Sequence, residues 1–376
     1  PAAEDLLKAQ VIDLVRPTEP VEIEVIHCQP PLVLVHQRKG GAGNLIGNAE
    51  AEGNIFRRAH GWYDSSVTRN GLRQIEALKK RFENVPVDAV YASDLIRTCT
   101  TAGAVYRPKG LALHREPRFR EVGMGVWEDV PFGQLAYDEP EKLLLFTQSP
   151  QRWAVEGSER YETFTGRFLQ ALDEVAQRHE GQSVAIFSHG MILQNVLGRL
   201  LYDGDTARLG HCENTGVSKL LYENGVYRAE YLFDSTHLPA EISTVGRQNW
   251  RKQGITKSNF RYRPAGPGDA EFLHALGYAL QPDDRVLLAY AEQTPAGAVV
   301  LRRADETTGG IVFLGLMPEF RGQGLAAQLL GCAVSAFRRD GLTWLCLLQA
   351  PQGASAHFFE DFCLLGSRVS LVPQVR

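Results

Sequence analysis

The sequence predicts an α/β protein with two domains, and three observations support this. The chain has 376 residues, more than one ordinary domain contains. Short apolar runs typical of buried strands alternate with amphipathic helical segments, as in sheets covered by helices on both faces. This pattern stops at residues 239–259, where the chain becomes polar and aperiodic, and it then starts again.

The composition is that of an ordinary soluble globular protein. Hydrophobic residues make up 44% of the chain and charged residues 22%, with a formal net charge of −4. This balance can fill a core and gives no reason to expect nucleic acid or an anionic membrane as a partner. No run approaches the ~18 apolar residues of a membrane-spanning helix, and the first residues lack a signal-peptide pattern. We therefore expect a cytoplasmic protein that acts on a small molecule.

The cysteines indicate a reducing environment. Six of them are scattered along the chain without a CxxC pair. Buried, reduced thiols explain such scattering better than disulfides or a metal site do. We expect no metal cofactor.

Residues 1–31 are predicted to form an N-terminal extension. Residues 3–15 have the pattern of a short amphipathic helix, and residues 21–25 alternate apolar and acidic side chains as a half-exposed strand does. Such a segment can add a strand to a sheet edge or contact a second copy of the chain, so a homodimer is one possibility.

The first domain is predicted to span residues 32–238. Residues 32–35 should form a buried strand. Gly41–Gly47 differs by one residue from the spacing of a dinucleotide-binding loop, and we expect it to be a flexible loop. Two amphipathic helices are expected after it: one is capped by Thr68 and has Leu72, Ile75, Leu78 and Phe82 on one face, and the other runs through Phe164, Phe168, Leu172 and Val175. The other expected elements are strands at 89–93 and 184–188, helices at 95–106 and 191–201, and an irregular stretch at 114–150.

A series of motifs runs through this first domain in a fixed order. They are Leu45–Asn54, His60–Ser65, Tyr91–Thr98, Arg120–Glu128, Phe187–Gly190, Asn214–Gly216 and Asp234–Leu238. In this order they resemble the histidine phosphatase superfamily, which has the phosphoglycerate mutase-like fold. The resemblance implies a three-layer α/β domain with a pocket for a phosphoryl group.

Three residues of these motifs are candidates for catalysis. A phosphoryl group in transit carries charge on three oxygens and needs donors placed in advance. Arg97 can hold two oxygens, and His189, at the end of a strand, can donate a further bond. Glu121 can protonate the leaving oxygen if burial raises its pKa. Considered alone, Arg97 could be an ordinary surface arginine and His189 an ordinary core histidine. The motifs that surround both residues favour a binding pocket instead.

The nucleophile of the family is missing from its expected place. By resemblance, Gly47–Ala49 stand where the family has Arg-His-Gly, and the histidine accepts the phosphoryl group covalently. The amide of Asn48 cannot do so, and we therefore expect Asn48 and Asn54 to bind substrate without phosphohistidine chemistry. His36, which directly follows the predicted strand at 32–35, is an alternative nucleophile in a rearranged site.

The second domain is predicted to span residues 260–376, after a linker at 239–259. Its expected elements are strands near 285–291, 296–303 and 310–317, a helix near 323–339 and a strand at 343–349. Between the third strand and the helix the chain reads Arg321-x-x-Gly324-x-Ala326. This segment resembles the signature of the GNAT (Gcn5-related N-acetyltransferase) family.

The second resemblance implies an acyl-CoA site. Small residues let the backbone approach a pyrophosphate, and the unpaired N–H groups of a first helical turn bind anions. The expected cofactor is acetyl-CoA or another acyl-CoA. Its candidate binding residues are Met317, Arg321, Gly322, Gln323, Gly324, Leu325 and Ala326. Phe359 stands where the family often has a tyrosine that protonates the thiolate, so another group must donate the proton or the domain binds without transfer.

Together, the two resemblances predict a bifunctional enzyme. The second domain would transfer an acyl group to a small-molecule amine, and the first would bind or process a phosphorylated or carboxylated molecule. Two alternatives stay open: a working phosphatase or mutase that uses His36, and a non-catalytic sensing or scaffold protein. Retention of Arg97, Glu121 and His189 counts against a scaffold, which needs no cationic pocket.

Overall fold

The structure is a computed structural model that describes residues 41–247, 259–351 and 354–375. All of them belong to one compact unit that begins at Arg38. The helix predicted at 3–15, the strands predicted at 21–25 and 32–35, and His36 lie outside the described residues.

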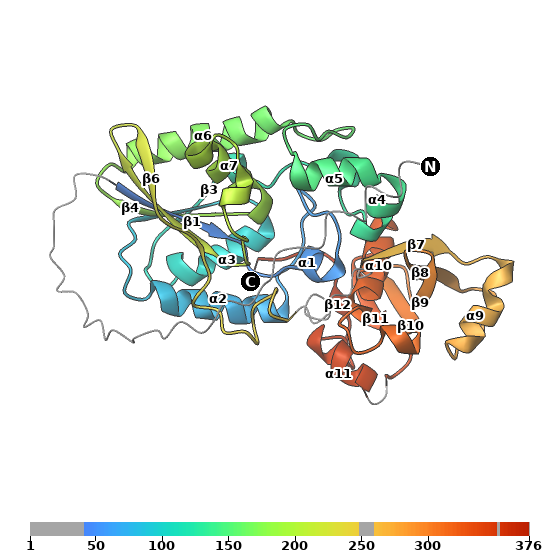
Figure 1. Cartoon of the computed structure of the whole chain (residues 1–376). Coiled ribbons are helices and arrows are strands. Elements are labelled where there is room, and N and C mark those ends of the chain that lie inside the picture. The colour runs from blue at the N-terminus through green and yellow to red at the C-terminus, as the bar shows by residue number, and fades with distance from the viewer. Residues whose placement is uncertain (1–40, 248–258, 352–353, 376) are drawn as a thin grey trace, which may run out of the picture. The chain divides into compact units, whose positions relative to one another are not determined.

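The first sheet has six strands among the described residues, in the order β3-β2-β4-β1-β5-β6 (Figure 1). The strands β1 to β4 are parallel, β5 runs antiparallel to β1, and β6 runs antiparallel to β5. Their bounds are β1 Gly41–Gly47, β2 Ala89–Ala92, β3 Leu113–Arg115, β4 Ser183–Ser188, β5 Val217–Glu223 and β6 Val226–Asp234. Parallel strands bring their carboxyl ends to one edge of the sheet, where ligands bind in α/β folds.

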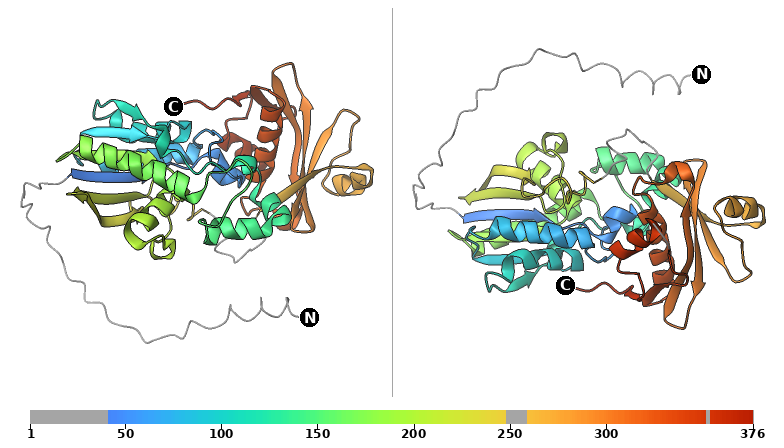
Figure 2. Two further views of the ribbon diagram at one scale, coloured as in Figure 1. Left: turned by 90° about the horizontal axis from the view of Figure 1, so that it is seen from above. Right: turned by 90° about the horizontal axis from the view of Figure 1, so that it is seen from below.

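Helices cover both faces of this sheet. Their bounds are α1 Glu52–Phe56, α2 Arg69–Phe82, α3 Ile96–Tyr106, α4 Phe132–Asp138, α5 Pro140–Gln148, α6 Tyr161–Arg178 and α7 Gly190–Tyr202. Successive residues of β1 point to opposite faces, so Leu45 packs with α6 and α7 and Ile46 packs with α2 and α3. Figure 2 shows α6 in front of the sheet from one side and α2 from the other. The predicted three-layer α/β class is confirmed.

Two expectations for the first domain are wrong. Gly41–Gly47 is the strand β1 rather than a loop, because its backbone pairs with β4 on one side and β5 on the other. Side-chain periodicity gives little sign of this strand, since three of its seven residues are glycines. Residues 114–150 are not irregular throughout, because α4 and α5 lie there. Both helices are short; Pro131 is the N-cap residue of α4, and Pro140 is the first residue of α5.

The second sheet also has six strands among the described residues, in the order β12-β11-β10-β9-β8-β7. The strands are β7 Phe260–Pro264, β8 Arg285–Ala291, β9 Thr294–Arg303, β10 Thr308–Leu316, β11 Trp344–Leu347 and β12 Val369–Ser370, and the helices are α9 Ala270–Ala275, α10 Ala326–Arg339 and α11 Ala354–Asp361. β10 pairs with β11 only as far as Ile311 but with β9 as far as Leu316. The predicted strands and the helix are confirmed, although the helix begins at Ala326 rather than near residue 323.

Helix α1 links the two sheets' cores. Phe56 of α1 is only 5% exposed and belongs to the hydrophobic core of the second domain. It lies against Gly331 of α10, where an added Cβ would meet the Phe56 Cβ at 2.4 Å. Polar contacts flank this packing, since Arg58 donates to Asp129 and to Ser335 of α10. Because α1 is in the first domain, the two domains share packing at this point.

The α1–α10 contact leads to a test with two helical glycines. Replacing Gly331 by alanine should destabilise the protein by about 1–3 kcal/mol, because the new methyl group overlaps Phe56. Gly166→Ala in α6 is the matched control, since nothing lies within 4 Å of its added Cβ. That variant should be unchanged or more stable by up to about 1 kcal/mol. Urea unfolding compares them, and equal midpoints would contradict the packing described.

Candidate active site

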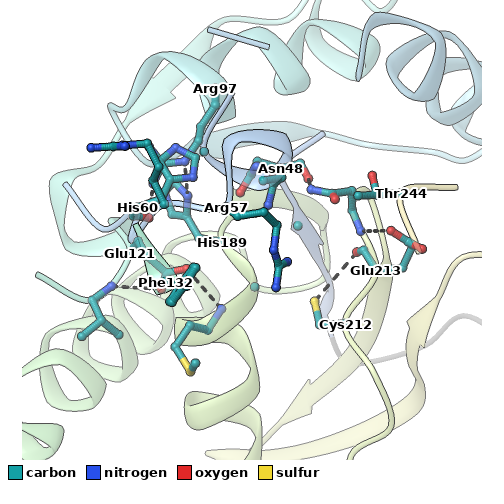
Figure 3. Close-up of a pocket in the computed structure, with 18 of the residues that line it drawn as sticks. Asn48, Arg57, His60, Arg97, Glu121, Phe132, His189, Cys212, Glu213 and Thr244 are labelled. Carbon is teal, nitrogen blue, oxygen red and sulfur yellow. Dashed lines mark hydrogen bonds between the residues drawn. The ribbon is translucent and has the colours of Figure 1, made fainter. Parts of the chain in front are cut away.

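A cavity of about 320 Å³ opens at the carboxyl ends of β1 and β4 (Figure 3). Five of the six candidate residues of the first domain line it: Asn48, Asn54, Arg97, Glu121 and His189. The sixth, His36, is outside the described residues. The structure therefore brings together residues that are up to 141 positions apart in the sequence (189 minus 48).

Arg97 is a buried cation in the wall of this cavity. It lies in the first turn of α3 and is 1% exposed. Its Nε donates to His189 Nδ1 at 3.1 Å, Nη1 donates to the carbonyl of Tyr63 at 3.1 Å, and Nη2 donates to the carbonyl of Gly61 at 2.7 Å. Burial lowers its pKa to about 10, which leaves it charged at neutral pH. The loop at residues 60–63 thus holds a fixed positive charge at the cavity wall.

His189 is neutral and has both ring nitrogens engaged. Because an arginine can only donate, Nδ1 must accept the bond from Arg97. The ring proton of the neutral form is therefore on Nε2, which donates to Ser93 Oγ at 3.0 Å. Burial, and next the charge of Arg97, lower the pKa of His189 well below its usual value. In this arrangement His189 orients Arg97, and it can donate to a ligand only by releasing Ser93.

The buried carboxyl group of Glu121 lies against the first turn of α7. Its oxygens accept bonds from the N–H groups of Ile192 at 2.8 Å, Val122 at 2.9 Å and Met191 at 3.1 Å. Burial, the largest influence, raises its pKa above the usual range. A raised pKa is the condition under which Glu121 can donate a proton to a leaving group.

Asn48 directly follows β1 and is 7% exposed. Its Nδ2 donates to the carbonyl of Ala49 at 2.8 Å, and its own carbonyl accepts a bond from Asn214 Nδ2 at 2.9 Å. Asn54 Oδ1 accepts from the N–H of Ala51 and so caps α1. An added Cβ on Gly47 would lie 3.8 Å from Cys212 Sγ. The end of β1 therefore presents the amide of Asn48, and the residue before it, Gly47, has no cationic side chain.

Other lining residues were missed by the sequence reasoning. Arg57, Arg58 and His60 follow α1, and the basic run at 57–60 was a signal for them. Thr244 and Val245 also line the cavity, although they fall within the predicted linker. The Val245 N–H donates to the buried carboxylate of Glu213, and Ser243 does too. This polar segment has no periodicity, so nothing in the sequence signalled its place in the wall.

The candidate acyl-CoA loop lies between β10 and α10. Gly322 and Gly324 have positive φ angles of 72° and 76°, both are exposed, and nothing lies within 4 Å of a Cβ added to either. No described residue accepts a hydrogen bond from their N–H groups or from that of Gln323. Arg321 Nε donates to the carbonyl of Leu316 at 2.8 Å, which holds the turn. Phe359 is buried in the core of the second domain.

Comparison with known families identifies both domains. The model of the "Histidine phosphatase superfamily (branch 1)" matches residues 45–235. The chain belongs to this superfamily. The model of the "Acetyltransferase (GNAT) family" matches residues 247–363. The domain limits proposed from the sequence stay a prediction.

Individual relatives match the first domain. A probable phosphoglycerate mutase, GpmB of Yersinia pestis (strain Pestoides F), is 28% identical over 200 residues, which cover 52% of this chain and 93% of that protein. The solved structure of Bacillus stearothermophilus YhfR is 27% identical with a TM-score of 0.50, covering 52% of this chain and 98% of that one. A structure titled "Mycobacterial hydrolase 2" has the same TM-score at 19% identity, covers 56% and 97% of the two chains, and supports the fold alone.

These matches establish the general class of the protein. Both families are enzyme families with small-molecule substrates, so the protein is an enzyme, and GNAT domains use acyl-CoA in general. Within the described residues, no group of three or more His, Cys, Asp or Glu side chains is placed to hold a metal ion. No helix in the same part of the chain is long and apolar enough to cross a membrane.

The neutral state of His189 makes stability depend on pH. Since its folded pKa lies below 6.5, the unfolded chain binds more protons below that pH, and the free energy of unfolding should fall as pH decreases from 6.5. His189→Gln keeps an acceptor for Arg97 but cannot titrate. Its stability should fall less steeply between pH 7.5 and 5.5, by at most about 1.4 kcal/mol per pH unit.

Urea unfolding at pH 7.5, 6.5 and 5.5 measures this dependence. His274→Gln, at an exposed position of α9, is the control and should keep the wild-type slope. A His189→Gln slope equal to that of the wild type would show that the histidine is not held neutral.

Proposed function

We propose that this protein is a two-domain enzyme in which the GNAT domain transfers an acyl group from acyl-CoA to the amine of a small molecule. The phosphatase-fold domain binds a phosphorylated or carboxylated small molecule, and residue 48 forms no phosphohistidine. The observation that carries the proposal is the cavity at the ends of β1 and β4. It keeps Arg97, Glu121 and His189 together but has Asn48 where an imidazole would be required.

The charges of the cavity support an anionic ligand. The guanidinium of Arg97 donates to uncharged backbone carbonyls, and no carboxylate among the described residues accepts a hydrogen bond from it. Burial raises the pKa of the Glu121 carboxyl group in the same cavity, which disfavours its charged form. A phosphate or carboxylate group entering the cavity would therefore meet the positive charge of Arg97.

The loop after β10 supports acyl-CoA binding. Open N–H groups at residues 322–324 and the first turn of α10 fit the pyrophosphate of coenzyme A, because side chains do not block the approach. Residues 317–326 would hold the cofactor, which supplies the acyl thioester. Phe359 has no proton to give, so the thiolate takes its proton from another group or from water.

Two other functions, a phosphatase that depends on His36 and a non-catalytic scaffold, have less support. A phosphatase that depends on His36 involves a residue outside the described part of the chain. A non-catalytic scaffold is disfavoured by the fixed charge of Arg97, because burying a cation costs free energy and a scaffold gains nothing from it.

Acyl-CoA binding is tested by isothermal titration of the intact protein with acetyl-CoA. Gly324→Ala should weaken binding at least about tenfold, because the positive φ strains the loop and the methyl group faces the pyrophosphate. Gly277→Ala is the control, since Gly277 has a similar φ of 90° and open surroundings before β8. It should bind as the wild type does. No detectable binding of acetyl-CoA by the wild type would remove the acyltransferase proposal.

Anion binding in the first domain is tested by titration with inorganic phosphate. Asn48→Asp adds a negative charge at the cavity with little change in size, and should weaken phosphate binding by at least about tenfold. Asn224→Asp is the matched control, because Asn224 lies in the exposed Asn-Gly turn between β5 and β6, where aspartate is equally suitable. If both variants bind phosphate like the wild type, the anion does not bind beside residue 48.

A further inference from the structure

A histidine to which the sequence analysis gives no catalytic role, His60, lines the same cavity. His60 lies with its ring directly over Gly53 of α1, where an added Cβ would be 2.4 Å from the ring's Cγ and Nδ1. Any residue other than glycine at position 53 would displace the ring. The chain therefore keeps a space for an imidazole in the cavity wall, close to the end of β1.

The two nitrogens of this ring have different surroundings. Nε2 lies 2.6 Å from Oγ of Ser65, a residue that is fully buried, and this contact anchors one side of the ring. Nδ1 has no hydrogen-bond partner among the described residues and is not an enclosed atom. The ring is partly exposed, and Figure 3 shows it beside Arg97 and His189. Nδ1 is thus the nitrogen available to a molecule in the cavity.

The surroundings keep the ring uncharged. Burial and the Arg97 guanidinium lower the pKa of His60 well below its usual value, so it carries a lone pair at neutral pH. Glu121, in the same cavity, has a pKa shifted in the opposite direction. These two directions favour an unprotonated His60 and a protonated Glu121, which are the states in which a base and an acid begin a reaction.

We propose that His60 is the general base for hydrolysis of a phosphate monoester bound in this cavity, with water as the nucleophile in place of the missing histidine. The proposal rests on the anion-binding function argued above and names its reaction. The ring is packed on the α1 backbone and anchored through Nε2, which holds it at the wall where a water molecule can separate it from the phosphorus.

The reaction balances without another reactant. With Nε2–H donated to Ser65, Nδ1 takes a proton from water as the water oxygen bonds to phosphorus. The bond between phosphorus and the ester oxygen breaks, and that oxygen takes the proton of the Glu121 carboxyl group. The products are an alcohol and inorganic phosphate. The imidazolium then loses its proton to solvent, and Glu121 regains one.

The test is turnover of a panel of phosphate monoesters, followed by chemical rescue. His60→Ala should lower kcat at least about a hundredfold. Because that variant leaves a ring-sized space over Gly53, added imidazole should restore part of its rate, which a purely structural histidine would not allow. His60→Gln fills the space and should be inactive without rescue. His274→Ala, on α9 of the other domain, is the control and should keep the wild-type rate with no response to imidazole.

Other results of this experiment would separate the role of His60 from the existence of the anion site. Phosphate binding without hydrolysis of any ester would overturn the role of His60 and leave the anion site standing. Neither binding nor hydrolysis would remove the anion site itself. Turnover by His60→Ala at the wild-type rate, or an acid-labile gain of one phosphoryl mass on the protein during turnover, would also refute general-base catalysis by His60.

Discussion

The pairing of β1 inside the first sheet is the constraint on which the site depends. Gly47 at the end of β1 lies opposite Ser188 at the end of β4, so Asn48 and His189 leave the sheet side by side. The register is fixed by the core, because a shift of one residue would turn Leu45 and Ile46 to the wrong faces. The apolar packing of one strand thereby determines which polar residues meet in the cavity.

One charge organises the chemistry of that cavity. Arg97 is held by backbone carbonyls, and its field helps to keep His60 and His189 neutral.

The cavity wall also packs against the second domain. Helix α1, which contributes Gly53 and Asn54 to the cavity, packs through Phe56 on α10, the helix that starts at the proposed acyl-CoA loop. The two proposed sites therefore border elements that share one hydrophobic core.

Much of this arrangement follows from the sequence. Arg97, Glu121 and His189 are found because they stand in ordered motifs that resemble those of the histidine phosphatase superfamily. β1 is not found, since its pairing is made by backbone groups of a glycine-rich segment. His60 stands in one of the motifs, but its position in the cavity wall is not predicted, because it depends on a contact with Gly53 that only the folded chain creates.

The central claim is that the cavity binds a phosphoryl-like anion without a covalent bond to a residue at the end of β1. A crystal structure of the protein with orthovanadate and acetyl-CoA tests it most directly. We expect vanadate between Arg97 and His60, with no bond from vanadium to a protein nitrogen and a water molecule next to His60 Nδ1. An empty cavity at saturating vanadate, or vanadium bonded to a histidine nitrogen, would contradict it.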